Sequence, residues 1–119
     1  MRASIRGYSS PDVDLDNFAP EDPERFAFLL QVLVGPEGGI GAESLSFTVC
    51  TPGHLSSLVD EIGTVPGHGL VITKSCDIDE IIAIVDRMVL RQTGEDWRAV
   101  AKNLGRIGII ESEDLLMTR

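Results

Sequence analysis

The feature that most constrains this chain is a pair of strand patterns separated by a glycine-rich stretch. Residues 26–34 form a nearly continuous apolar run, which is typical of a central strand covered on both faces. In residues 44–50, apolar side chains alternate with Ser and Thr, which indicates a second strand. Residues 35–41, between them, hold four glycines and a proline. The two patterns therefore predict a β-hairpin.

Three later segments have the apolar spacing of amphipathic helices, and each has a capping signal at its start. Thr51 and Pro52 begin the first of them, and Gly63 ends it. Asp77 lies three residues before a Glu at the start of the second, close to a capping box. Residues 93–96 separate the second helix from the third, which Gly105 is expected to close.

The order of the remaining elements predicts the fold class. Residues 1–8 and 70–73 have the composition of short strands, and Trp97 lies on the apolar side of the last helix, which indicates a role in the core. We expect an α+β domain, with a mostly antiparallel sheet of about four strands and three helices packed on one face. The 119 residues suffice for one such domain, with an acidic, proline-rich loop at 9–24 and a frayed tail at 115–119.

Charge narrows the classes of partner. The chain carries 10 basic and 19 acidic residues, for a net charge of −9, and six acids lie between Asp12 and Glu24 without one base. Such a surface repels nucleic acids and anionic membranes, whereas it attracts a basic protein and steers its approach. A simpler interpretation is that the acidity keeps the domain soluble. No apolar run is long enough to span a bilayer, and the first eight residues lack the apolar stretch of a signal peptide, so we expect a soluble, cytoplasmic protein.

The residue types that support metal binding or nucleophilic catalysis are few. The soft ligands are Cys50, His54, His68 and Cys76, and they lack the closely spaced pairs of a structural zinc site. A nucleophile formed by Cys50 and His54 remains an alternative, although no residue is evidently placed to orient the imidazole. The glycine-rich residues 35–41 lack the Lys of a phosphate-binding loop. We therefore predict no catalytic residue, no cofactor and no metal site.

One acidic motif bears on calcium. The spacing Asp12-x-Asp14-x-Asp16 resembles the start of an EF-hand loop. The sixth position is Asn17, where the sharp turn requires Gly, and the twelfth is Pro23, where a Glu ligand is required. A solvated acidic loop is the preferred interpretation.

Several segments in the second half resemble one family. They are Cys50-Thr-Pro-Gly-His-Leu55, Leu70-Val-Ile72, Asp77-Ile-Asp-Glu-Ile81, Gly94-Glu-Asp-Trp97 with its helix up to Arg106, and Glu111-Ser-Glu-Asp114. Over about residues 44–115 the chain resembles the immunity protein 8 (Imm8) family. These are small bacterial proteins that neutralise the toxin domains of polymorphic and contact-dependent toxin systems.

The resemblance implies a cognate toxin domain as partner, bound stoichiometrically so that it is occluded. Carboxylates would pair with its Lys and Arg around a few apolar anchors, and steering helps most if that toxin is a basic nuclease. The acids in segments without periodicity are the predicted partner-binding residues, because their side chains need not serve the core. These residues are Asp12, Asp14, Asp16, Glu21, Asp22, Glu24, Glu111, Glu113 and Asp114. A homodimeric adaptor paired through an exposed strand edge is a further alternative, and the sequence leaves the oligomeric state open.

Overall fold

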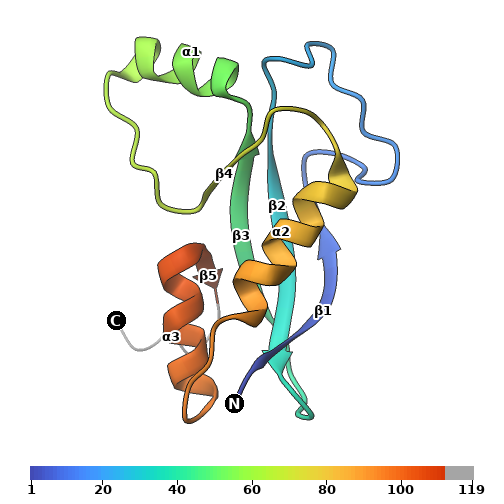
Figure 1. Cartoon of the computed structure of the whole chain (residues 1–119), viewed down its shortest axis with the longest axis vertical. Helices are drawn as coiled ribbons and strands as arrows, with labels where there is room; N and C mark the ends of the chain where they lie inside the picture. Colours follow the sequence, from blue (N-terminus) through green and yellow to red (C-terminus); the bar gives the residue numbers. More distant parts are fainter. Residues whose placement is uncertain (112–119) are drawn as a thin grey trace.

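The computed structural model of the chain describes residues 1–111 and places three helices against and beside one sheet (Figure 1). The elements in chain order are β1 (Ala3–Ser9), β2 (Ala27–Pro36), β3 (Glu43–Cys50), α1 (Pro52–Ile62), β4 (Leu70–Ile72), α2 (Ile78–Leu90), α3 (Trp97–Ile107) and β5 (Ile109–Glu111). The predicted α+β class and the mostly antiparallel sheet are confirmed.

The hairpin of β2 and β3 forms the centre of the sheet. The two strands pair antiparallel from Ala27 opposite Cys50 to Val34 opposite Glu43. The other edge of β3 has two partners. Its last residues pair in parallel with β4, and residues 44–46 pair antiparallel with β5. The strand order is β1-β2-β3-β4, with β5 paired to β3. The sheet thus has five strands rather than about four.

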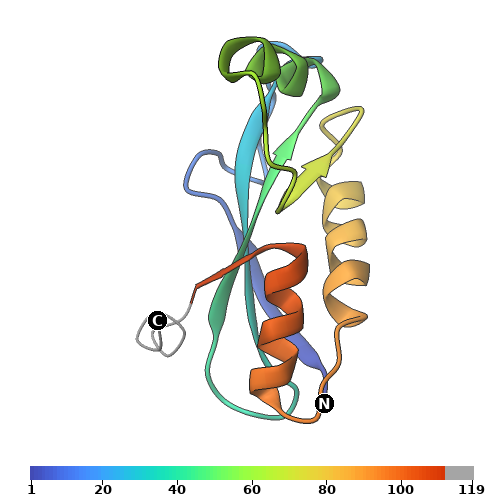
Figure 2. The ribbon, with the colours of Figure 1, turned by 90° about the vertical axis from the view of Figure 1, so that its left-hand side faces the viewer.

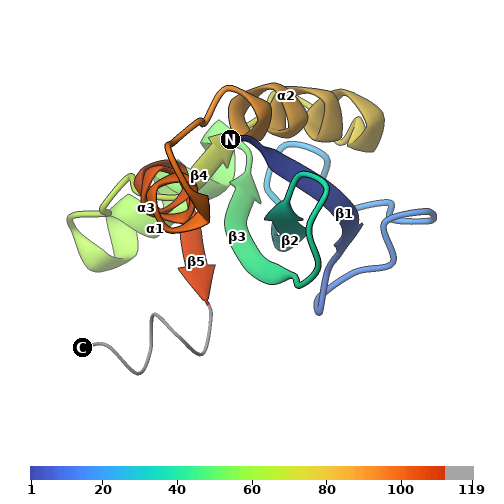
Figure 3. The ribbon, with the colours of Figure 1, turned by 90° about the horizontal axis from the view of Figure 1, so that it is seen from below.

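Helices α2 and α3 cover one face of this sheet (Figure 2). Seen from below, α2 lies over the β1 side and α3 over the β5 side (Figure 3). The side chains buried between the layers are Phe28, Leu30, Val32, Val34, Leu45, Phe47, Val49, Ile81, Val85, Val89, Val100 and Leu104. Helix α1 extends beyond the end of the sheet, and none of its residues is buried. It serves as the connection between the parallel strands β3 and β4.

The three predicted helix starts are confirmed by their capping bonds. The side chains of Thr51, Asp77 and Asp96 accept hydrogen bonds from the amides of the residues three positions later. The predicted end of the third helix is wrong, because α3 continues through Gly105 and is capped at Gly108. A Cβ atom on Gly108 would lie 2.9 Å from side-chain atoms of Leu45 and Phe47. The helix therefore ends where its backbone meets β3.

Residues 10–26 form neither helix nor strand. Ser9, expected in the loop, instead belongs to β1, and Phe26, expected in a strand, lies just before β2. Within residues 1–111, no helix has the length and apolar character that crossing a bilayer requires.

Candidate functional site

The acidic segment, which we define as residues 10–24, is anchored to the core by its apolar side chains. Val13, Leu15 and Phe18 are partly buried against the core cluster. The Phe18 ring meets Phe26 and Phe28 edge-on, with ring centroids 5.9 and 5.4 Å apart. Aromatic pairs in this arrangement add to the free energy of burial. The segment is therefore held against the sheet while its carboxylates face outward.

Side-chain hydrogen bonds also fix the backbone of the acidic segment. Asp12 Oδ2 accepts a 2.8 Å bond from the amide of Leu29, which continues the edge of β2 beyond the end of β1. Asp14 accepts bonds from the side chain of Asn17 at 2.9 Å and from the amide of Asp16 at 3.0 Å. These two bonds, the Asn17 bond first, lower the pKa of the Asp14 carboxyl below its ordinary value. Asp14 therefore remains charged under mildly acidic conditions.

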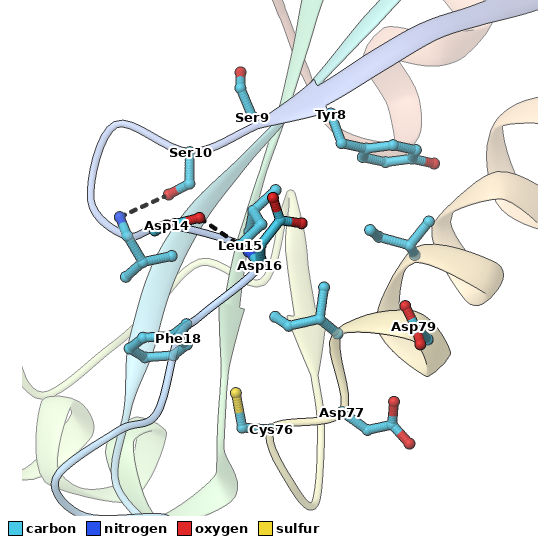
Figure 4. Close-up of a pocket in the computed structure, with 13 residues that line it drawn as sticks. Tyr8, Ser9, Ser10, Asp14, Leu15, Asp16, Phe18, Cys76, Asp77 and Asp79 are labelled. Atoms are coloured by element: carbon cyan, nitrogen blue, oxygen red, sulfur yellow. Dashed lines mark hydrogen bonds between the residues drawn. The ribbon is translucent and has the colours of Figure 1, made fainter.

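A groove of about 800 Å³ lies between the acidic segment and the start of α2 (Figure 4). Asp14 and Asp16 line it from the segment, and Asp77 and Asp79 line it from the other side. All four side chains are exposed. The apolar part of its lining includes Leu15, Phe18, Ile78 and Ile82, and Cys76 also lines it.

Two of these four carboxylates, Asp77 and Asp79, were not predicted as site residues. Asp77 has the pattern of a helix cap, which is confirmed, and Asp79 only lies off the apolar stripe of its helix. Their position opposite Asp14 and Asp16 depends on contacts between segments some sixty residues apart, as the numbering shows. Local spacing carries no signal for such a pairing.

Trp97, assigned to the core by the sequence, is half-buried and packs against it. Its indole Nε1 donates a 3.1 Å hydrogen bond to Glu43 Oε1 at the start of β3. The other oxygen, Glu43 Oε2, is buried and has no hydrogen-bond partner among residues 1–111. The hydrogen bond from the indole therefore offsets part of the free-energy cost of burying the Glu43 carboxylate.

A comparison with protein-family models identifies the chain. The model described as Immunity protein 8 (Imm8) matches residues 3–115. The chain belongs to the Immunity protein 8 family. No curated protein and no solved structure matches it. The family match begins at residue 3, well before residue 44, so it includes β1, the acidic segment and both sides of the groove.

The predicted partner-binding residues fall into separate regions of this Immunity protein 8 fold. The six acids of the first cluster, Asp12 to Glu24, are all exposed and lie in the acidic segment. Glu111 is also exposed but lies in β5, opposite Ser44 of β3. The acidic segment meets the sheet at Leu29, which lies opposite Thr48. Thr48 and Ser44 are four residues apart along β3, which is roughly 13 Å. The structure does not bring Glu111 together with the first cluster, and Glu113 and Asp114 lie outside the described residues.

The Cys50 and His54 alternative gains no support from the structure. Cys50 is 1% exposed, and burial raises the pKa of its thiol, whereas a nucleophile needs a lowered pKa. Burial, and then the nearby Asp77 carboxylate, raises the pKa of the Cys76 thiol. His68 Nε2 is 2.9 Å from the carbonyl oxygen of Gly108. In the part of the chain that the structure describes, no three His, Cys, Asp or Glu side chains could together hold a metal ion.

Three raised pKa values predict how stability depends on pH. Burial, followed by the hydrogen bond to and charge of Asp86, raises the pKa of Tyr8, as burial does for Cys50 and Cys76. The unfolded chain loses these protons at a lower pH than the folded chain does. The free energy of unfolding is therefore at its full value at neutral pH and declines as the pH rises above about 9. Each tenfold difference in proton affinity is worth about 1.4 kcal/mol. Urea unfolding at pH 7, 9 and 10.5 measures the decline, which Tyr8→Phe and Cys76→Ser should each reduce. A flat profile in the unmodified protein would contradict this prediction.

Proposed function

We propose that this chain is an immunity protein that binds one cognate toxin domain and neutralises it by occlusion, in the bacterial cytoplasm and without bond chemistry of its own. Membership of the Immunity protein 8 family supports the general role. The observation that supports this mechanism is the anchored acidic segment, in which six exposed carboxylates have no intervening base. A basic toxin would be attracted to it over distances of about the Debye length, roughly 8 Å at physiological salt.

The hydrogen bonds within the segment favour a charged partner. The described bonds to Asp12, Asp14 and Asp22 come from amide groups of the chain, which carry no positive charge that would offset the acidity of the segment. A carboxylate that is already ordered loses less conformational entropy when it pairs with a Lys or Arg. We therefore expect association to be fast at low salt and to slow as salt increases.

The homodimeric alternative has weaker support. Strand β1 is at one end of the strand order, but its register with β2 shifts between Ile5 and Gly7. Irregularities of this kind disfavour edge-to-edge pairing of strands. Light scattering of the purified chain, alone and with the toxin domain, separates a homodimer from a one-to-one complex.

The decisive experiment uses a candidate toxin domain, taken from a gene that adjoins the gene for this chain. Titration calorimetry should give one chain per toxin domain, and the complex should abolish toxin activity. The variant E21K/D22K/E24K should associate about tenfold more slowly at low salt, with a weaker dependence on salt. The control D60K/E61K/E95K changes the net charge equally at exposed sites outside the segment, and we expect a smaller effect.

Two results would count against the proposal. Absence of a complex with the neighbouring toxin would refute the binding role. Equal kinetics for the segment variant and its control would remove the acidic segment from the interface.

A further inference from the structure

We propose that the groove between the acidic segment and α2 receives a basic segment of the toxin, whose Lys or Arg side chains lie on the apolar lining and reach the four aspartates. This inference rests on the proposed function and specifies where and how the partner is held. The aspartates are Asp14, Asp16, Asp77 and Asp79, and the apolar lining includes Leu15, Ile78 and Ile82.

The chemistry of the lining favours long cationic side chains over a metal ion. An ion requires several oxygens converging on one point, and among residues 1–111 no group of three carboxylates meets that condition. The carboxylates instead lie on opposite sides of a space of about 800 Å³ with apolar surface between them. Lys and Arg bury their aliphatic stems against such surface and keep the charged end at the polar rim.

The start of α2 does not cancel the negative charge of the groove. A helix N-terminus carries roughly half a positive charge, which opposes a cationic ligand. Asp77, Asp79 and Glu80 lie within or next to the first turn of α2 and together outweigh it. Asp14 and Asp16 add two further negative charges from the other side. Complementarity with a basic segment therefore holds along the whole groove.

The surface along α2 is hollowed on both sides of Tyr8, which favours a ligand several residues long. A second hollow of about 440 Å³ shares Tyr8 with the first and is lined by Asp86 and Leu90 of α2. Together with Ile78 and Ile82, these residues recur at intervals of four and so follow one side of the helix. The Tyr8 hydroxyl donates a hydrogen bond to Asp86 between the two hollows. A single side chain would fill only part of this length.

Cys76 provides a direct probe of groove occupancy in the unmodified protein. Its side chain lines the groove and is partly exposed, whereas Cys50 is buried and does not line it. We expect iodoacetamide to alkylate Cys76 at least tenfold more slowly when the toxin domain is present at saturation, as measured by mass spectrometry. If calorimetry shows a complex but the alkylation rate is unchanged, the groove proposal is overturned and the proposed function stands. If no complex forms, both are overturned.

A matched pair of variants tests the charge contribution. Asp16 and Asp79 are exposed, and no described hydrogen bond to either carboxylate holds the fold of residues 1–111. The variant D16K/D79K should weaken toxin binding about 100-fold, while D60K/E95K, with the same change in net charge, should weaken it less than fivefold. Equal losses in the two variants would overturn the proposal. Calorimetry with CaCl₂ alone should show no binding below millimolar concentrations, and tight calcium binding would overturn it as well.

Discussion

Replacing Phe47 by alanine should lower the free energy of unfolding by about 4 kcal/mol, within the range for buried aromatic residues. Phe47 is 1% exposed and lies in the central strand β3, opposite Leu30 of β2. Its ring also lies close to the backbone of Gly108, where α3 ends. Because strands and a helix enclose the ring on several sides, the structure cannot collapse into the space that truncation leaves.

Urea unfolding measures this effect, and Leu33→Ala provides its control. Leu33 lies in the neighbouring strand β2, but its side chain is 42% exposed and belongs to the alternate set of positions in that strand. We expect Leu33→Ala to lower the free energy of unfolding by about 1 kcal/mol or less. A similar loss in both variants would show that Phe47 does not occupy the tightly packed position described above.

Replacing Trp97 by alanine should lower the free energy of unfolding by about 3 kcal/mol, at the lower end for large aromatic residues because the ring is only half-buried. The variant removes both the packing of the indole on the core and the hydrogen bond to Glu43. Trp97→Phe retains most of the packing but leaves both oxygens of Glu43 without the indole donor. We expect a loss of about 1–2 kcal/mol from this variant.

A double-mutant cycle isolates the hydrogen bond between Trp97 and Glu43. With Glu43→Met, which has the length of Glu without its carboxylate, and Trp97→Phe as the single variants, urea unfolding should give a coupling free energy of about 1 kcal/mol. Trp97→Phe should also cost less in the Glu43→Met background, because no buried carboxylate is then left without its donor. A coupling free energy near zero would show that the bond contributes nothing to stability.

The parts of the fold that were predictable have local causes. The hairpin follows from an apolar run and an alternation on either side of glycines, and the helix starts follow from single capping residues such as Thr51. The end of α3 was not predictable in this way, because Gly108 matters through its approach to β3 and Gly105 has the same local appearance. Strand β5 has only three residues and exists because β4 leaves half of the β3 edge unpaired.

The candidate site also has a part that local sequence predicts and a part that depends on contacts between distant segments. The acidic segment is visible in the sequence, since its charges are contiguous and its prolines exclude regular structure. The groove is not visible, because it forms only when Phe18 packs on Phe26 and Phe28 and brings Asp14 and Asp16 opposite the start of α2. Asp12 illustrates a further limit, since a residue predicted to bind a partner also completes the edge of β2.

The position of α1 has a consequence for how the chain tolerates mutation. No side chain of this helix is buried, and it is attached through the adjoining strands, the Thr51 cap and a hydrogen bond from Arg25 to Ser57. Substitutions on its surface therefore leave the core untouched and change stability by only about 0.5 kcal/mol. The exposed positions of such a helix can accumulate sequence differences, so two descendants of this chain could diverge there in charge while folding equally well, whereas Gly53 packs too closely on the Glu24 backbone to change.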